Sequence, residues 1–151
     1  MRRITMLCLF VAVACQAQFA SADGLIMTRS THSVAQTLDR LEASLRAKGM
    51  KVFARIDHSA GAKSVGTALR PTQLLIFGNP KIGSQLMTSQ QSVAIDLPMK
   101  ALAWEDVDGK VWLAYNDPGY LSARHRIKDR DAVVQKMKGA LKKFVGQATK
   151  P

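Results

Sequence analysis

Residues 101–115 read Ala-Leu-Ala-Trp-Glu-Asp-Val-Asp-Gly-Lys-Val-Trp-Leu-Ala-Tyr, and this stretch decides the fold class. The Asp-Gly pair at 108–109 adopts the positive φ angles of a two-residue hairpin turn at little cost, and apolar residues alternate on both sides of it. Counting outward from that turn predicts that Glu105 lies opposite Trp112. Trp104 then points to the other face, so the two tryptophans are expected on opposite faces of an antiparallel pair.

A helix over residues 33–48 is the clearest element before the hairpin. Ser33 and Gln36 have the spacing of a capping box, and apolar residues follow at intervals of three and four. Gly49 can close the helix in the left-handed conformation. The pattern therefore predicts an amphipathic helix whose apolar stripe belongs to the core.

The remaining patterns complete an α+β architecture. The other predicted elements are strands over 25–29, 51–58 and 72–77, a helix from Asn79 through Met87, a helical turn near 92–96 and a terminal helix over 131–145. In the second of these strands, alternation places Val52, Ala54 and Ile56 on one covered face. The small residues of 59–66 predict a loop. The order β-α-β-β-α-β-β-α predicts a single domain with one mostly antiparallel sheet and helices packed on it.

Residues 1–22 are predicted to be a secretory signal peptide. They combine a basic start at 2–3, an apolar run over 4–14 and a small-residue cleavage site that ends at Ala22. The apolar run is shorter than the roughly 20 residues that a membrane-spanning helix needs. Export would place the mature domain in the periplasm or outside the cell.

The mature chain is expected to be one α+β domain over 23–146 with a flexible tail over 147–151. It contains no cysteine, because Cys8 and Cys15 both lie within the signal. That excludes a disulfide framework, a thiolate nucleophile, a cysteine-ligated zinc site and an iron–sulfur cluster. The alternative is a lipoprotein, in which Cys15 is lipidated and anchors the mature chain.

The positive charge is concentrated at one end of the chain. The full sequence has 22 basic and 11 acidic residues, a net charge of +11, and removal of the signal leaves +9. Residues 124–151 hold 9 basic and 2 acidic residues, or +7 of that charge. This pattern predicts a basic C-terminal helix whose lysines face water or make weak contact with acidic envelope surfaces. Nucleic acid is a disfavoured partner, because aromatic interleaving and recognised binding motifs are missing from the sequence.

Residues 77–84 form the most informative candidate site, because a predicted strand ends there and a helix begins. Asn79 is a good helix cap, and Gly83 and Ser84 lie at the end of the first turn. The free N–H groups and the positive dipole end of such a helix attract anions, and an anionic ligand would favour Lys81 in the first turn. The simpler interpretation is that Asn79 only caps the helix while Lys81 points to water.

The sequence shows no recognisable catalytic constellation. Its histidines are His32, His58 and His125, and none has the spacing of a metal-binding pair. A nucleophile elbow, a phosphate-binding loop and a dinucleotide fingerprint are also missing from the sequence. No cofactor and no metal are therefore predicted.

A series of short motifs runs in order from about residue 27 to 126. It includes Ile56-Asp57-His58, Leu69-Arg70-Pro71-Thr72, Phe77-Gly78-Asn79-Pro80-Lys81, Asp96-Leu97-Pro98, Trp104-Glu105-Asp106 and Tyr115-Asn116-Asp117-Pro118. This series resembles the family known as domain of unknown function 302. The resemblance implies a small α+β domain that pairs as a homodimer and has no established reaction. Ser84 departs from the threonine of the family pattern but keeps the hydroxyl. Because His58 belongs to the same series as Asn79 and Lys81, a shared polar pocket is expected.

Two functional hypotheses follow from the sequence. The first is an exported, homodimeric, non-catalytic domain that binds a small anionic or polar ligand; its candidate residues are His58, Asn79, Lys81, Gly83 and Ser84. The second is a small hydrolase or lyase with His58 as general base and Lys81 as electrophile. The hypotheses differ in one spatial requirement, because the second needs His58 and Lys81 at a common concave site.

Overall fold

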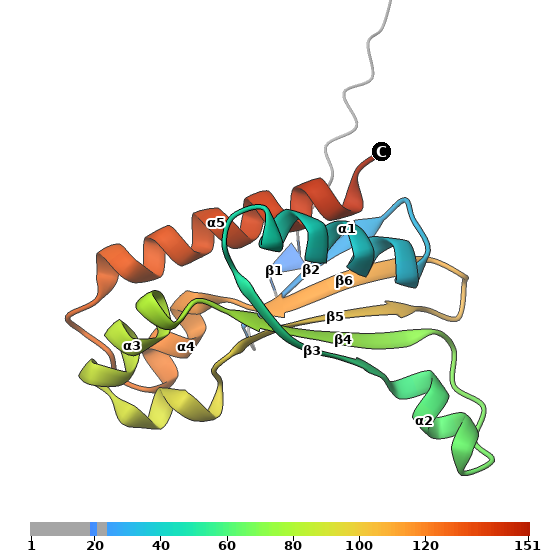
Figure 1. Ribbon diagram of the computed structural model, residues 1–151, viewed down its shortest axis with the longest axis horizontal. Helices are drawn as coiled ribbons and strands as arrows, with labels where there is room; N and C mark the ends of the chain where they lie inside the picture. The colour runs from blue at the N-terminus through green and yellow to red at the C-terminus, as the bar shows by residue number, and fades with distance from the viewer. Residues whose placement is uncertain (1–18, 21–23) are drawn as a thin grey trace, which may run out of the picture.

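The computed structural model describes residues 19–20 and 24–151 (Figure 1). Its centre is a six-stranded, fully antiparallel sheet in the order β1-β2-β6-β5-β4-β3. The strands are β1 (Phe19–Ala20), β2 (Leu25–Ser30), β3 (Lys51–Asp57), β4 (Thr72–Gly78), β5 (Met99–Glu105) and β6 (Val111–Asn116). The predicted α+β class with an antiparallel sheet is confirmed. The predicted signal peptide lies outside the described residues, apart from β1.

The helices lie on one face of the sheet and at its two ends. They are α1 (Val34–Arg46), α2 (His58–Ser64), α3 (Pro80–Ser89), α4 (Pro118–Arg124), α5 (Asp131–Thr149) and the 3-10 helix η1 (Gln91–Ile95). Helices α1 and α5 pack against each other on the same face of the sheet, whereas α3 and α4 gather near the start of α5 (Figure 1). Helix α2 extends from the opposite end of the sheet (Figure 1).

Helix α1 forms as its sequence predicts and supplies much of the core. The Ser33 hydroxyl accepts the Gln36 N–H at 3.3 Å, and the Gln36 side chain accepts the Ser33 N–H at 3.2 Å. This capping box supplies partners for donors that a helix start leaves unpaired. The apolar stripe behind it is fully buried, with Leu38, Leu41 and Leu45 at most 1 % exposed. The core therefore lies between α1, α5 and the sheet face beneath them.

The β5–β6 hairpin forms at the predicted position, but its register differs by one residue. Trp104 lies opposite Trp112, whereas the sequence pattern predicts Glu105 at that place. Opposite residues share a face, so the two tryptophans lie on the same face and the prediction of opposite faces is wrong. The adjacent pair Ala103 and Leu113 is fully buried beneath the helices. Both tryptophans therefore belong to the face that α1 and α5 do not cover, where they are half-buried.

Asp106 explains the shifted register. Its N–H donates to the Lys110 carbonyl at 2.9 Å, so the loop holds three residues rather than two. Its carboxylate accepts the N–H groups of Asp108 and Lys110, each at 2.9 Å, and the Trp112 indole N–H at 2.7 Å. Gly109 has a φ of +73°, which closes the longer loop. The two-residue prediction fails because an aspartate side chain before the Asp-Gly pair stabilises a wider turn.

Strand β3 departs from its predicted alternation at a β-bulge. The register shifts between Val52 and Ala54, so Phe53 is an extra residue in the strand. Val52 packs against the core, whereas Ile56 on the other face is 40 % exposed. The prediction that Val52, Ala54 and Ile56 share one covered face is therefore wrong, because a bulge inverts the alternation beyond it.

Two short helices were not anticipated by the sequence patterns. Segment 59–66, predicted as a loop, instead lies mostly in α2, where the Asp57 carboxylate accepts the Ala60 N–H at 2.9 Å. Helix α4 begins in the same way, with Asp117 as cap and Pro118 as its first residue. Aspartate caps and an N1 proline are sequence signals for a helix start, but the short apolar stripes behind them gave no clear period.

Helix α5 includes residues 147–149, which the sequence pattern assigns to a flexible tail. The Arg40 guanidinium donates to the Lys150 carbonyl at 2.9 Å, and the Thr31 N–H donates to the Thr149 carbonyl at 3.0 Å. These donors serve carbonyl groups that a helix end otherwise leaves without a partner. The helix continues because the β2–α1 connection and α1 supply its C-terminal hydrogen bonds.

Gly139, inside α5, gives a direct test of the surroundings of this helix. A Cβ at Gly139 would meet nothing within 4 Å. Gly139→Ala is therefore expected to raise the free energy of unfolding by about 0.5–1 kcal/mol, because alanine loses less backbone entropy in a helix. Urea unfolding measures the change. Gly24→Ala is the contrasting variant, since φ is +80° there and a Cβ would lie 2.1 Å from Tyr120 Cγ. A lower unfolding midpoint for Gly139→Ala would contradict the described environment.

Asp106 should make the hairpin sensitive to acid. The hydrogen bond from the Trp112 indole, followed by those from the Lys110 and Asp108 N–H groups, holds the pKa of Asp106 below its ordinary value of 3.8. A carboxyl group with a lowered folded-state pKa stabilises the fold above its unfolded pKa, and this contribution disappears as the pH falls through the folded pKa. The stability difference between the parent and Asp106→Asn is therefore expected to be largest at neutral pH and to shrink below about pH 4. Urea unfolding across pH measures it, and a pH-independent difference would argue against this role.

Candidate functional site

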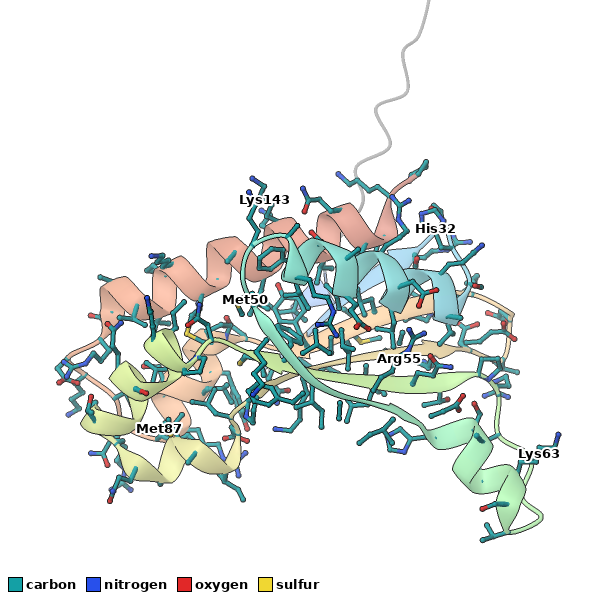
Figure 2. All side chains as sticks on the ribbon, in the orientation of Figure 1. His32, Met50, Arg55, Lys63, Met87 and Lys143 are labelled. Atoms are coloured by element: carbon teal, nitrogen blue, oxygen red, sulfur yellow. The ribbon has the colours of Figure 1, made fainter. Side chains whose placement is uncertain are left out.

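A cavity of about 680 Å³ opens between α3, α5 and the end of the sheet where β3 begins and β4 ends. Its volume lies within the roughly 300–1,000 Å³ that is typical of small-molecule sites. Its apolar lining includes Phe53, Phe77, Leu97, Met137, Leu141 and Phe144. Figure 2 labels three of its lining residues: Met50 just before β3, Met87 on α3 and Lys143 on α5.

Methionine is concentrated in this cavity. Four of the seven methionines of the chain line it, namely Met50, Met87, Met99 and Met137. They come from the chain before β3, from α3, from β5 and from α5. Methionine is unbranched and polarizable, so such a lining can adapt its shape to an apolar ligand.

The polar lining residues lie mainly at the mouth and are mostly basic. Lys48, Lys136 and Lys143 line the cavity together with Asn79 and Ser84, and all three lysines are exposed. Among the described lining residues there is no aspartate or glutamate. The mouth therefore has a positive electrostatic potential above an apolar interior.

The structure divides the five predicted site residues between two regions. Asn79, Gly83 and Ser84 line the cavity, whereas Lys81 is exposed and lies outside its lining. His58 lies elsewhere, at the start of α2. The expected shared pocket of His58, Asn79 and Lys81 is therefore not formed.

The direction of β3 explains this separation. Lys51 pairs with Gly78 at one end of the β3–β4 ladder, and Asp57 pairs with Gln73 at the other. Asn79 follows Gly78, whereas His58 follows Asp57, so the two residues lie at opposite ends of the ladder. Six steps of about 3.3 Å separate these ends by roughly 20 Å.

The start of α3 is capped by its own residues. The Asn79 side-chain oxygen accepts the Lys81 N–H at 2.9 Å, which confirms the predicted cap. The Asn79 carbonyl accepts the N–H groups of Ile82 and Gly83 at 3.0 and 2.9 Å, and Pro80 has no N–H. Within the described chain, every backbone donor of this first turn is already used. An anion here would depend on lysine side chains rather than on the backbone.

The carboxylate beside His58 is also engaged. Asp57 accepts the Ser59 hydroxyl at 2.6 Å, the Ala60 N–H at 2.9 Å and the Gln73 amide at 3.0 Å. The Ser59 hydrogen bond and then the Ala60 hydrogen bond lower the pKa of Asp57. Asp57 therefore acts as a helix cap, and it does not orient the exposed His58 as a general base.

A different histidine cluster was not singled out from the sequence. His125 Nε2 lies 2.6 Å from Asp96 Oδ2, and His125 Nδ1 lies 3.0 Å from Ser92 Oγ. The His125 side chain is 7 % exposed, and Arg124 also contacts Asp96 at 3.3 Å. None of these residues is among the lining residues of the cavity. Their hydrogen bonds instead connect η1 to the end of α4. Sequence spacing could not reveal it, because Asp96 and His125 are 29 positions apart.

The His125 cluster should contribute to stability. His125→Ala is expected to lower the free energy of unfolding by about 1–3 kcal/mol, because it removes hydrogen bonds from the mostly buried Asp96 carboxylate and from Ser92. The matched control is His58→Ala at an exposed position, where a change within about 0.5 kcal/mol is expected. Urea unfolding compares the two, and equal effects would show that His125 does not clamp these elements.

The fold and the cavity define a small α+β domain with an apolar cavity that is also lined by lysines. Residues 26–144 match the family described as Domain of unknown function DUF302, and the chain belongs to this family. The crystal structure of an uncharacterized conserved protein DUF302 from Bacillus stearothermophilus has a similar fold, with a TM-score of 0.75 over 83 % of this chain and 98 % of that chain. The two sequences are 17 % identical, so the likeness concerns the fold alone.

Three Brucella proteins are similar in sequence. The chain is 52 % identical over 104 residues to the fluoride-specific ion channel FluC 1 of Brucella suis biovar 1, which covers 69 % of this chain and 41 % of that protein. The same identity and length hold for FluC 1 of Brucella abortus biovar 1 and FluC 2 of Brucella melitensis biotype 1, at 38 % of each protein. The chain thus spans about two-fifths of the length of these relatives. Within the described residues, no helix has the length and apolarity needed to cross a membrane.

Proposed function

We propose that this domain is a non-catalytic binding module whose ligand occupies the cavity between α3, α5 and the sheet. The observation that carries the proposal is the continuous apolar lining beneath a lysine-bearing mouth. The described lining contains no histidine, cysteine, aspartate or glutamate that could act as a general base. The composition of the cavity therefore favours binding over reaction.

The geometry gives little support to a hydrolase or lyase that uses His58 and Lys81. Such an enzyme needs both side chains within reach of one substrate. His58 lies at the far end of the β3–β4 ladder from the start of α3, and Lys81 lies outside the cavity lining. The binding module remains the better proposal.

We further propose that the domain acts as an exported homodimer. The signal-like residues 1–22 support export, and the apolar character of the uncovered sheet face supports pairing. That face carries the half-buried Leu74, Leu102, Trp104 and Trp112 in register across neighbouring strands. A second copy could bury this surface by a two-fold contact, which would remove it from water.

The Brucella relatives suggest a setting in the bacterial envelope. A channel has to cross a membrane, and the chain matches only 38–41 % of each relative. We propose that the ion-conducting part of those proteins lies outside the matched 104 residues. In this proposal the matched domain is an accessory binding module beside a transport protein. The apolar cavity suits an organic ligand better than a fluoride ion, whose hydration it could not replace.

A cavity-filling variant tests the binding module. A Cβ at Gly83 would lie 3.7 Å from Leu97 Cδ1 and 3.9 Å from Met87 Cε, and both residues line the cavity. Gly83→Leu should therefore place its side chain inside the cavity, where it takes space from a ligand, without backbone strain. The uncharged dye N-phenyl-1-naphthylamine, whose fluorescence rises in apolar sites, is expected to bind the parent and to bind Gly83→Leu at least tenfold more weakly.

Gly139→Leu is the matched control, because its Cβ meets nothing within 4 Å and dye binding should be unchanged. Equal dye binding by the parent and Gly83→Leu would refute the cavity as the site. Native mass spectrometry of the same proteins tests the dimer, and a purely monomeric parent would refute pairing.

A further inference from the structure

We infer that the ligand of the cavity is an amphipathic anion, with a single apolar chain inside and a negatively charged head among Lys48, Lys136 and Lys143. This inference rests on the proposed function, because it names the ligand class of the same site. The interior and the mouth of the cavity each contribute a separate argument.

The interior selects an apolar body. Apart from the lysines, Asn79 and Ser84 are the polar side chains among the described lining residues, and the Asn79 oxygen already accepts the Lys81 N–H. A polar ligand buried here would lose hydrogen bonds to water and find few replacements. An alkyl chain loses none, and the four methionines can close around it.

The mouth selects a negative charge. Lys136 and Lys143 lie seven positions apart on α5, about 10 Å along the helix, and Lys48 lines the same cavity from the turn that follows α1. Within the described chain, none of the three lysines has an ion pair or a side-chain hydrogen bond. Lys110 and Lys138 differ in this respect, because they pair with Asp108 and Asp117 at 3.2 Å each. Three lysines that line a mostly apolar cavity and have no carboxylate partner among the described residues fit a carboxylate or phosphate head on an apolar chain.

The positive charge of the C-terminal segment fits a location at anionic membranes, where amphipathic anions occur. Residues 124–151 carry a net charge of +7, and α5 bears two of the three mouth lysines. A basic surface is drawn to anionic bilayers, where single-chain amphiphiles partition. The amphiphile could be a free fatty acid or a single-chain phospholipid, which share an anionic head and an apolar chain.

Displacement of N-phenyl-1-naphthylamine from the full chain tests the inference. Decanoate is expected to displace the dye, whereas butyrate and decyltrimethylammonium at equal concentration are not, because one lacks the chain and the other has the opposite charge. Octanoate, decanoate and dodecanoate should bind about fourfold more tightly for each added methylene group. Decanoyl lysophosphatidylglycerol provides the phospholipid arm. Whichever of this lipid and decanoate binds with higher affinity identifies the source of the head group.

Lysine variants test the mouth with matched charge. Lys48→Ala/Lys136→Ala/Lys143→Ala is expected to weaken decanoate about tenfold and to leave binding of the uncharged dye unchanged. Lys63→Ala/Lys128→Ala/Lys142→Ala changes the net charge equally at exposed lysines outside the cavity, and it should leave decanoate affinity within twofold of the parent.

The outcomes separate this inference from the proposed function. If the dye binds the parent and Gly83→Leu blocks it, the cavity is a binding site. Equal displacement by decanoate and decyltrimethylammonium, or equal losses in the two lysine triples, would then overturn the amphipathic-anion inference alone. Failure of the dye to bind the parent would overturn the proposed function itself.

Discussion

The packing of α1 and α5 side by side on one sheet face is the constraint on which the site depends. Helix α1 has 13 residues and α5 has 19, or about 20 and 28 Å at 1.5 Å per residue. Because Arg40 and Thr31 hold the C-terminal end of α5 beside α1, the excess length projects past the end of α1 and over α3 (Figure 1). The cavity occupies the space beneath that overhang.

Local sequence signals predicted most of the elements, with α2 and α4 as exceptions, but they did not predict the alignment between strands. The capping box of Ser33 and the cap of Asn79 act within a few residues, so the sequence reveals them directly. The hairpin register depends on the Asp106 side chain, and the face of Ile56 depends on the bulge at Phe53. A shift of one residue in strand register exchanges the two faces of a strand. The periodicity of apolar residues alone does not determine that register.

The candidate site could be predicted only in part for a related reason. Asn79, Gly83 and Ser84 belong to one strand-to-helix connection, so a local motif places them together. His58 shares a motif series with them, but the length of β3 separates it from the cavity. Lys48 and Lys143 are 95 positions apart in the chain, and they meet the same cavity because α1 packs on α5. Tertiary packing determines such a contact, which therefore leaves no spacing pattern in the sequence.

The methionine lining also exposes the cavity to a chemical change that leaves the fold's topology untouched. Oxidation converts a methionine thioether to a sulfoxide, which is polar and chiral. Met87 is partly accessible on α3, and the more buried Met99 and Met137 belong to the same lining. A sulfoxide at any of these positions would place a strong hydrogen-bond acceptor against an otherwise apolar wall. The same methionines that let this cavity adapt to a ligand therefore make its ligand affinity dependent on the oxidants and reductases around the protein.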